Sequence, residues 1–549
     1  MTASLLVLAV LTAQAQTQMR TDDTPAHAGN TSSRELTLSE AIELAVHANL
    51  EVEISRLDEA SAGASLKAAR GYTDLNFKFQ PDYASKSTPA PSLLEAANGK
   101  LDEHDETGNF YLHEQTPWNG AALDLAFENS RISSENPFLG INPFYTSQLA
   151  FTYTQPLWRN REFDANRSTI LVRARQADLS RTDLELRLMD VVDRVQQTYW
   201  DLSAARQNEK VAGESVDLAQ AQLVRDQNRI NAGSLAQAEL AAAQAELARR
   251  RDIWYASASI VTEQENLLKQ LLAGSRDAPL WQQELVPTDQ QAISTAEAEP
   301  IPDLVNQALK RRPELKSIAI RQQITGIEKR QNENLVKPQV NLVGNYSLAG
   351  LGGKLNTAPD PITQSTQPLI NQLNAILGPL GEPSVTAPTL GQLPGAVIGG
   401  YGTDLATLFS GRYQTVQAGL QVDLTFRNRA AKAAIEESVI AEHREKLEQA
   451  REEQSIQSEI RDAIEALAIA RQRRAAAESG ERAAREKLES ETRLFETGES
   501  TNFLTLTRQN EYFEARRRLL IATLEWNKAV CRLQRSTGTT LTENHVALQ

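Results

Sequence analysis

Two long tracts of the chain place hydrophobic residues three or four positions apart. This spacing puts them on one narrow stripe of a helix, and the residues between them are mostly Arg, Glu, Gln and Ala, which favour helices. Proline, which breaks helices, is absent from 157–278 and from 395–549. Both tracts therefore predict long, coiled-coil-like helices with one solvated face. The stripe residues are Leu184, Leu188, Val191, Val195, Tyr199, Leu202 and Ala205 in the first tract and Ile456, Ile460, Ala463, Leu467 and Ala470 in the second.

Each helical tract contains a glycine at an equivalent place, followed by a helix-capping residue. Gly233 precedes Ser234, and Gly498 precedes Glu499, Ser500 and Thr501. A glycine just past one helix and a Ser or Thr at the start of the next predict a helical hairpin turn. The predicted helices are Leu38–Arg70, Arg161–Ala232, Ser234–Leu272, Asp303–Lys337, Arg429–Thr497 and Glu499–Arg532.

Short segments between the helical tracts alternate hydrophobic and polar residues, which predicts strands with one apolar and one polar face. The clearest segment is 416–426, where Val416, Leu420, Val422 and Leu424 alternate with polar residues or glycine. Three others are 149–153, with Leu149, Phe151 and Tyr153, 75–79 and 340–346, and 123–127 is a possible fifth. The first membrane strand is either 75–83 or lies within 110–128.

The two halves of the chain repeat. A shift of 263 places Ala45 on Ala308, and a shift of 265 places Gly233 on Gly498. Self-similarity at a nearly constant offset indicates two copies of one structural unit. The predicted parts are a signal peptide at 1–15, a first repeat at 36–272, an equatorial belt or linker at 273–302, a second repeat at 303–535 and a tail at 536–549.

The strand pattern suits an outer-membrane barrel, since lipid would meet one face and water the other. Two predicted strands per repeat give four per chain. Open sheet edges are excluded from lipid, and the smallest membrane barrels have about eight strands. The barrel must therefore be shared, and three chains would supply twelve strands. The predicted fold class is α+β, with long coiled-coil hairpins that form a hollow cylinder of helices and four strands per chain in a common twelve-stranded barrel.

Composition narrows the function. The net charge is −14, and the Lys and Arg residues alternate with Asp and Glu, so nucleic acid is not an expected partner. The single cysteine, Cys531, excludes a disulfide framework. No catalytic constellation, cofactor motif or metal-ligand spacing occurs, and we expect no enzymatic activity. The acidic run Leu101–Glu106, with His104, is read as a solvated loop rather than a cation site, and Gly350–Lys354 as a structural glycine-rich loop.

The N-terminus has features of an export signal. An apolar run from Leu5 to Leu11 precedes Ala13-Gln14-Ala15, which has the form of a signal-peptidase site. No later run of about 18 apolar residues occurs, so a transmembrane helix is not expected.

Six segments together resemble the TolC-type outer-membrane efflux protein family: Leu36–Ile42, Gln155–Arg159, Tyr199–Leu202, Arg311–Leu315, Phe426–Arg429 and Gly498–Thr501. The resemblance covers about residues 35–540, and it rests on the order and spacing of the segments. It implies a homotrimer with a twelve-stranded barrel in outer-membrane lipid and a helical tunnel across the periplasm. It also implies docking to a periplasmic adaptor, or membrane fusion, protein and an inner-membrane transporter for multidrug or type I secretion efflux.

The resemblance places the periplasmic tip and its adaptor contacts at the two hairpin turns. The residues assigned to this tip and gate are Arg229, Gly233, Ser234, Arg493, Gly498, Glu499, Ser500 and Thr501. Some family members carry an acidic ring after the second turn, but Leu504 and Thr507 stand at the matching positions, and Glu499 is an alternative source of a ring. The insertions at 85–145 and 356–409 are read as extracellular loops, with a plug or partner-binding role as the alternative.

The resulting hypothesis is a trimeric outer-membrane channel that conducts substrates passively to the cell exterior. The alternative is a periplasmic coiled-coil adaptor or scaffold protein without a barrel. A scaffold would show the same helices with glycine turns, but it would not need strands on both sides of each hairpin. The sequence leaves the cargo, the pump and the adaptor open, because a wide aqueous duct needs no specific binding motif.

Overall fold

The computed structural model describes residues 32–90, 99–233, 236–289, 300–357, 361–386 and 393–547. The chain divides into two compact units. The first contains the described parts of 1–62, 176–322 and 444–549, and the second those of 63–175 and 323–443. Both predicted repeats contribute to each unit, so the compact units cut across the repeat halves. The predicted signal peptide lies outside the described residues.

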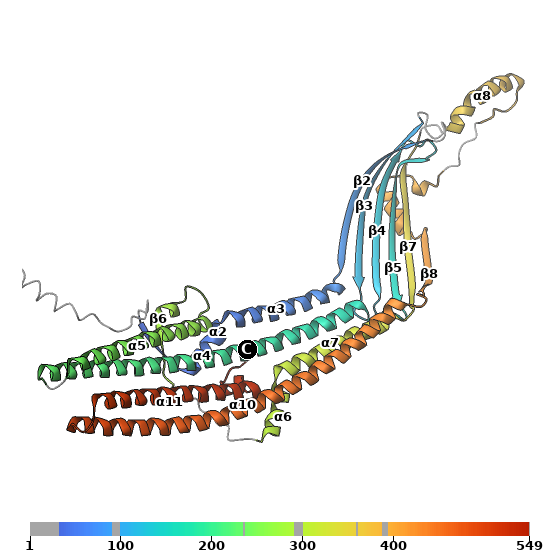
Figure 1. Ribbon diagram of the computed structural model, residues 1–549. Helices are drawn as coiled ribbons and strands as arrows, with labels where there is room; N and C mark the ends of the chain where they lie inside the picture. The colour runs from blue at the N-terminus through green and yellow to red at the C-terminus, as the bar shows by residue number, and fades with distance from the viewer. Residues whose placement is uncertain are drawn as a thin grey trace, which may run out of the picture. The chain divides into compact units, whose positions relative to one another are not determined.

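Four long helices form the two predicted hairpins. They are α4 (Ala165–Asn231), α5 (Gln237–Leu272), α10 (Arg429–Thr497) and α11 (Asn502–Thr537), shown in Figure 1. The tract from Arg161 to Asp164 was predicted to be helical, but it forms the connection into α4. The other helix ends differ from the predicted ones by at most five residues, because capping and turn geometry set them more finely than hydrophobic spacing does.

The two shorter predicted helices are each broken once. Leu38–Arg70 is α2 (Leu38–Ala48) and α3 (Leu50–Arg70), and the second predicted helix is α6 (Ile301–Arg311) and α7 (Pro313–Leu335). The breaks fall at Asn49 and Arg312, which lie 263 positions apart, as the repeat requires. Asn49 caps α3 by accepting a hydrogen bond from the N–H of Glu51 at 2.9 Å. Pro313 has no N–H, so it starts a new helix rather than continuing α6.

The hydrophobic stripe predicted on the first tract forms the core of the first unit. Every stripe residue from Leu184 to Ala205 is buried, and in the second tract Ile456 and Ile460 are fully buried. A two-stranded parallel sheet of β1 (Ser32–Leu36) and β6 (Gln283–Pro287) contributes Leu36 and Leu285 to this core. The Tyr199 hydroxyl donates to the Leu36 carbonyl at 2.9 Å and so joins α4 to that sheet. The described C-terminal residues include the short helix α12 (Thr540–Glu543).

The second unit contains a six-stranded antiparallel sheet, not the four strands that were predicted. Its order is β2, β3, β4, β5, β7 and β8. The first repeat supplies four of these strands and the second supplies two, so the possible fifth strand at 123–127 is real and belongs to β4. The bounds are β2 Asn76–Pro89, β3 Lys100–Gln115, β4 Ala122–Ser134, β5 Ile141–Pro156, β7 Gln339–Leu355 and β8 Gln414–Asp423.

Strand β3 replaces the loop that was expected at Leu101–Glu106. Four acidic side chains in this run hid the strand pattern, but cross-strand pairing accommodates some of their charge. Arg131 of β4 donates to Glu106 at 2.9 Å, and Lys86 of β2 lies 3.9 Å from Glu103. The insertion at 85–145 is therefore mostly sheet rather than extracellular loop. The glycine-rich segment Gly350–Lys354 is also in a strand, β7.

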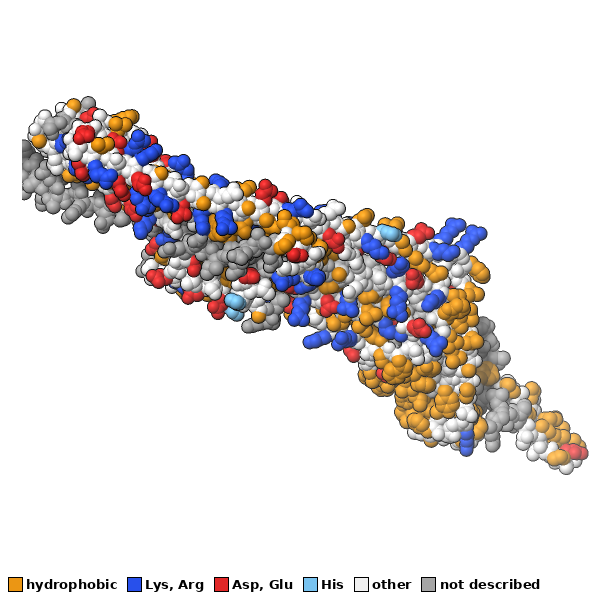
Figure 2. Space-filling view, turned by 90° about the horizontal axis from the view of Figure 1, so that it is seen from below, with side chains coloured by type: hydrophobic (Ala, Val, Ile, Leu, Met, Phe, Trp, Pro, Cys, Tyr) orange, Lys and Arg blue, Asp and Glu red, His pale blue; other side chains and the backbone are white. Residues whose placement is uncertain are grey.

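An apolar row and an adjacent polar row, on opposite faces of the sheet, cross all six strands. One cross-strand row is apolar throughout: Phe77, Leu112, Leu125, Phe151, Tyr346 and Val416. The next row, on the opposite face, is polar throughout: Asn76, His113, Asp124, Thr152, Asn345 and Gln417. Figure 2 shows hydrophobic side chains gathered over the strands, whereas charged side chains are spread over the helices.

The second insertion, expected to be a loop, contains helices. These are α8 (Pro361–Leu377) and α9 (Tyr401–Phe409), and α9 packs on β7 and β5. Two glycines of β7 permit this packing, because a Cβ on Gly350 would lie 2.5 Å from Asp404 Oδ1 and one on Gly352 would lie 2.7 Å from the Asp404 nitrogen. Short 3-10 turns occur at Gly71–Thr73, Pro279–Gln282, Gly378–Leu380 and Gly395–Val397.

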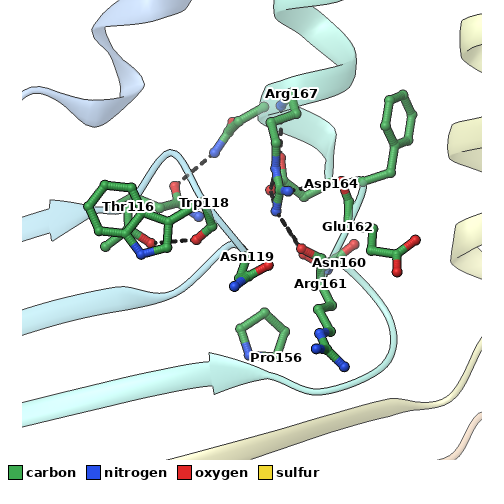
Figure 3. Close-up of polar contacts among 12 residues, drawn as sticks. Thr116, Trp118, Asn119, Pro156, Asn160, Arg161, Glu162, Asp164 and Arg167 are labelled. Carbon is green, nitrogen blue, oxygen red and sulfur yellow. Dashed lines mark hydrogen bonds and ion pairs between the residues drawn. The ribbon is translucent and has the colours of Figure 1, made fainter.

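Arg167 fixes the connection between β5 and α4 (Figure 3). Its guanidinium donates to Asp164 Oδ2 at 2.7 Å and to the Asn160 carbonyl at 3.2 Å. Asn160 has a φ of 66°, and Asn428, its counterpart in the Arg-Asn-Arg repeat, also has a positive φ. Asparagine tolerates this left-handed conformation better than most residues. The repeated motif is therefore a backbone device that turns a strand into a helix.

None of the helices in the described part of the chain has both the length and the apolar character needed to cross a membrane.

Candidate functional site

The second hairpin turn has the predicted glycine geometry. Gly498 has a φ of 80°, its N–H donates to the Phe495 carbonyl at 3.2 Å, and the Glu499 N–H donates to the Leu494 carbonyl at 2.9 Å. These two bonds form a Schellman motif, which closes a helix on a left-handed residue. Thr501 then caps α11, since its side chain accepts from the Leu504 N–H at 3.4 Å.

The first hairpin turn shares the glycine but not the predicted cap. Gly233 has a φ of 74°, and its N–H donates to the Ile230 carbonyl at 2.9 Å. The N-cap of α5 is Ala236, which makes no side-chain capping bond. The predicted cap, Ser234, lies outside the described residues. The helix thus starts later than the capping pattern indicated.

A buried carboxylate lies one to two turns before the first glycine. Asp226 of α4 is 1% exposed, and it accepts hydrogen bonds from Gln222 Nε2 at 2.9 Å and from Asn502 Nδ2 at 3.3 Å. Gln222 also donates to Asn502 Oδ1 at 2.9 Å. Since Asn502 is the first residue of α11, this network connects the first hairpin to the turn of the second.

The second hairpin carries a carboxylate at the equivalent place. Glu491 lies seven residues before Gly498, as Asp226 lies seven residues before Gly233. It accepts a hydrogen bond from the Ser500 hydroxyl, and Arg508 Nε lies 3.8 Å from its Oε2. Arg508 also binds Glu511 at 2.8 Å, and this hydrogen bond raises the pKa of Arg508. Each turn therefore has an acid bound by a residue at or near the start of α11.

A cation–π contact joins the two hairpins beside the turns. The Arg229 guanidinium lies 5.1 Å from the centroid of the Phe495 ring. Of the predicted tip residues that the structure describes, all are exposed except Ser500, which is half-buried. Leu504, at one position of the family's acidic ring, is 39% exposed, and Thr507 at the other donates to the Phe503 carbonyl at 2.8 Å.

A second buried network lies further along the same helices. Arg250 of α5 is 2% exposed and donates to the Ser215 carbonyl of α4 at 3.0 Å and to Asn510 of α11 at 3.2 Å. Glu246 accepts from Arg250 at 2.8 Å. Burial opposes ionisation of Glu246, but its hydrogen bonds with Arg249 and Arg250 outweigh burial, so the pKa of Glu246 is lowered. Arg250 thus ties three helices together.

These buried polar residues were not predicted from the sequence. Asp226, Gln222 and Arg250 stand among many exposed polar residues of similar type, and spacing does not separate them. The 265-residue offset that aligns the glycines also aligns Asp226 with Glu491, and this was a usable signal. The described residues contain no group of three or more His, Cys, Asp or Glu side chains arranged to hold a metal ion.

The predicted membrane-strand residues share one face of the sheet. Leu149, Phe151 and Tyr153 lie on one face of β5, and the row of Phe151 continues through Tyr346 to Val416 on β8. Leu420 and Val422 lie on the same face of β8 as Val416. Leu424 comes one residue after β8 ends. Val416 and Leu420 are 73% and 66% exposed, because β8 is an edge strand.

A family model matches the C-terminal part of the chain. Residues 387–539 match the model of the family described as Outer membrane efflux protein. The predicted resemblance to outer-membrane efflux proteins is confirmed. No curated protein sequence matches the chain.

Solved structures of outer-membrane channels share the fold at low sequence identity. The Campylobacter jejuni CmeC outer membrane channel is 14% identical with a TM-score of 0.62, and the match covers 92% of this chain and 86% of that one. The Neisseria gonorrhoeae MtrE outer membrane channel, in its open state, is 14% identical with a TM-score of 0.56 and 94% coverage of both chains. The outer membrane protein VceC of Vibrio cholerae is 11% identical with a TM-score of 0.58, covering 91% of this chain and 96% of that one. The predicted α+β class is confirmed, with six strands in place of four.

Proposed function

We propose that this chain is one subunit of a homotrimeric outer-membrane channel that conducts substrates passively to the cell exterior. The observation that carries the proposal is the two-faced sheet. The row from Phe77 to Val416 is apolar and suits contact with lipid. The adjacent row, from Asn76 to Gln417, is polar and lies on the opposite face, where it suits a water-filled lumen. The family match and the shared fold support the same function.

The hairpin turns are the proposed contact with a periplasmic adaptor protein, which in turn docks to an inner-membrane transporter. The gate is mechanical in this proposal. Small shifts of packed helices switch interfaces between discrete states, and the polar networks at Asp226 and Glu491 are the bonds that such a shift would break. The duct performs no chemistry of its own.

The sheet favours a channel over a periplasmic scaffold. A coiled-coil adaptor does not require six strands of 10 to 17 residues that are crossed by an unbroken apolar row. In water, such a row would be a large exposed hydrophobic patch, which soluble proteins avoid. In lipid it is the surface that a membrane strand requires.

A matched pair of substitutions on β5 tests the proposal. Phe151 lies on the apolar face, and Ala150 lies beside it on the polar face. An arginine in mid-membrane on a lipid-facing position costs roughly 2–4 kcal/mol, whereas a lumen position tolerates it. We expect Phe151→Arg to abolish insertion into the outer membrane and Ala150→Arg to preserve it.

The measurements are membrane fractionation, heat-dependent gel mobility of the detergent-extracted oligomer, and conductance in planar bilayers. A conducting trimer from the native chain and from Ala150→Arg supports the proposal. A soluble monomer, or equal tolerance of both arginines, would overturn it.

A further inference from the structure

The sheet has two open edges, and we propose that these edges pair between copies of the chain to close a barrel of eighteen strands. This inference rests on the proposed trimeric channel and states how its barrel is built. It differs from the twelve-stranded barrel that the family resemblance implies, because each chain supplies six strands to its sheet.

The additional strands lie inside the sheet rather than beside it. The hairpin of β3 and β4 stands between β2 and β5, with continuous pairing on both sides. Removing these strands from the barrel would break the pairing of β2 with β3 and of β4 with β5. The inserted hairpin is therefore part of the wall.

The backbone hydrogen-bonding groups at the two edges of the sheet need partners. Strands β2 and β8 form these edges, on opposite sides of the sheet (Figure 1). Nearly every residue of β2 and all residues of β8 are exposed. An unpaired backbone edge is not tolerated in lipid, and six strands are fewer than the smallest closed membrane barrel of about eight. A second copy of the chain is the occupant that satisfies both edges by one repeated contact.

The directions of the edge strands allow this contact. Each neighbouring pair in the sheet is antiparallel, so β2 and β8 run in opposite directions. Joining β8 of one copy to β2 of the next keeps the whole barrel antiparallel with an even number of strands, as in bacterial outer-membrane barrels.

The stagger of the sheet matches that of a closed barrel. The cross-strand row that starts at Asn76, the first residue of β2, reaches Gln417 on β8, six residues before the strand ends at Asp423. Six strands thus accumulate a stagger of six residues, or one per strand. In an eight-stranded barrel with a total stagger, or shear, of eight residues, the ratio of stagger to strand number is also one, and the strands tilt by about 36° from the barrel axis. This tilt is within the usual range for membrane barrels.

This stagger fixes the register of the joint. In this register, Asp423 of one copy lies directly opposite Asn76 of the next copy. Two apolar pairs then form across the joint, Val422 with Phe77 and Leu420 with Phe79. All four apolar side chains are more than half exposed in the single chain. On the polar face, Gln421 pairs with Lys78, and Asp423 is the diagonal neighbour of Lys78. Pro81 withholds at most one donor from this ladder, as is usual for proline on an edge strand.

The functional consequence of the larger strand number is a wider pore. Barrel diameter rises roughly linearly with strand number, and barrels of sixteen to eighteen strands enclose an aqueous channel. Eighteen strands would give a pore about 1.5 times as wide as twelve.

A cysteine pair at the joint tests the register. Lys78→Cys with Gln421→Cys places two thiols on directly opposite residues of the polar face, where oxidant has access. The native Cys531 is buried and remains in place. Oxidation of the detergent-extracted protein is expected to link chains into a series that ends at three. The control, Lys78→Cys with Gln417→Cys, separates the thiols by about four residues, or ~13 Å, and should not link.

A second pair, Asn76→Cys with Asp423→Cys, tests the same register if the first variant does not assemble, and imaging of the native oligomer counts the strands directly. Linked trimers with eighteen strands are the expected result. A trimer with twelve strands and no linkage would overturn the inference and leave the proposed channel intact. Linkage that ends at two chains would overturn both the eighteen strands and the trimer, and a soluble monomer would overturn the channel itself.

Discussion

The side-chain amide of Asn502 donates a hydrogen bond to the carboxylate of Asp226, with 3.3 Å between Nδ2 and Oδ2. The contact joins the start of α11 to the end of α4, in a place where Asp226 is almost fully buried. A buried acceptor of this kind holds its donors in place, since leaving them unsatisfied costs roughly 1–3 kcal/mol. The contact therefore restrains the turn of one hairpin relative to the other.

Replacing Asp226 should loosen this restraint. Asp226→Ala removes the acceptor of the Asn502 amide and one of the two acceptors of the Gln222 amide, so we expect a higher resting conductance of the channel in planar bilayers. Asp217→Ala, an exposed acid on the same helix, removes the same charge and should leave the resting conductance unchanged. Equal behaviour of the two variants would argue against a gating role for the network.

The cation–π contact of Arg229 with Phe495 predicts a smaller effect at the same end of the hairpins. Phe495→Leu keeps a hydrophobic side chain but removes the aromatic face, at a cost of about 0.5–1 kcal/mol for an exposed pair. A double-mutant cycle with Arg229→Gln, read by thermal unfolding of the extracted protein, should show coupling of that size. Additive effects of the two substitutions would mean that the contact contributes nothing.

Helices and the apolar strands were predictable because a single repeated spacing specifies each of them. The stripe from Leu184 to Ala205 is buried as predicted, and Val416 to Val422 forms a strand as predicted. Strand β3 was missed because Asp102, Glu103 and Asp105 break the alternation that marks a strand. Glu103 lies 3.9 Å from Lys86 of β2, and Asp102 pairs with Lys100 of its own strand. The contact with β2 depends on the strand pairing, which the local sequence does not reveal.

Part of the tip was predictable and part was not. Gly233 and Gly498 follow from a local rule, because the chain needs a positive φ where a helix ends and turns back. Asp226 and Arg250 depend on which side of a long helix meets its neighbours. Their partners Asn502 and Asn510 lie more than 250 residues away, and only the packed structure identifies them.

The close packing of α9 on β7 predicts that a valine in β7 destabilises the protein at one glycine position and not at another. Gly350 faces Asp404 so closely that a Cβ would lie 2.5 Å from its Oδ1 and 2.6 Å from its carbonyl oxygen. Gly350→Val should displace α9, and overpacking of this kind typically costs about 1–3 kcal/mol. Gly344 lies on the same face of β7, and a Cβ added there would meet no neighbouring atom within 4 Å, so Gly344→Val is the matched control.

Limited proteolysis and thermal unfolding distinguish these two variants. We expect new cleavage near 393–413 and a lower unfolding temperature for Gly350→Val only. The same cleavage pattern in both variants would show that valine disturbs β7 itself rather than the seat of α9.

The last prediction concerns pH and the first unit's core. Burial raises the pKa of Asp193 from its ordinary value to about 6, and the nearby Arg535 guanidinium and the 2.6 Å hydrogen bond from Gln197 offset burial only in part. The folded state therefore binds this proton more tightly than the unfolded state does. Stability contributed by the proton is present below about pH 4 and is lost as the pH rises to about 6, by an amount on the order of 3 kcal/mol at most.

Asp193→Asn removes this titration while its side-chain oxygen still accepts from Gln197. We expect the variant to match the native protein at about pH 4 and to unfold at a higher temperature at pH 7. Thermal unfolding of both proteins from pH 4 to 8 measures the difference, and Asp201→Asn, which removes a carboxylate paired with Lys528, is the control that should not stabilise. A constant difference across the pH range would contradict the assignment, because only a group that titrates between these values makes the difference grow as the pH rises.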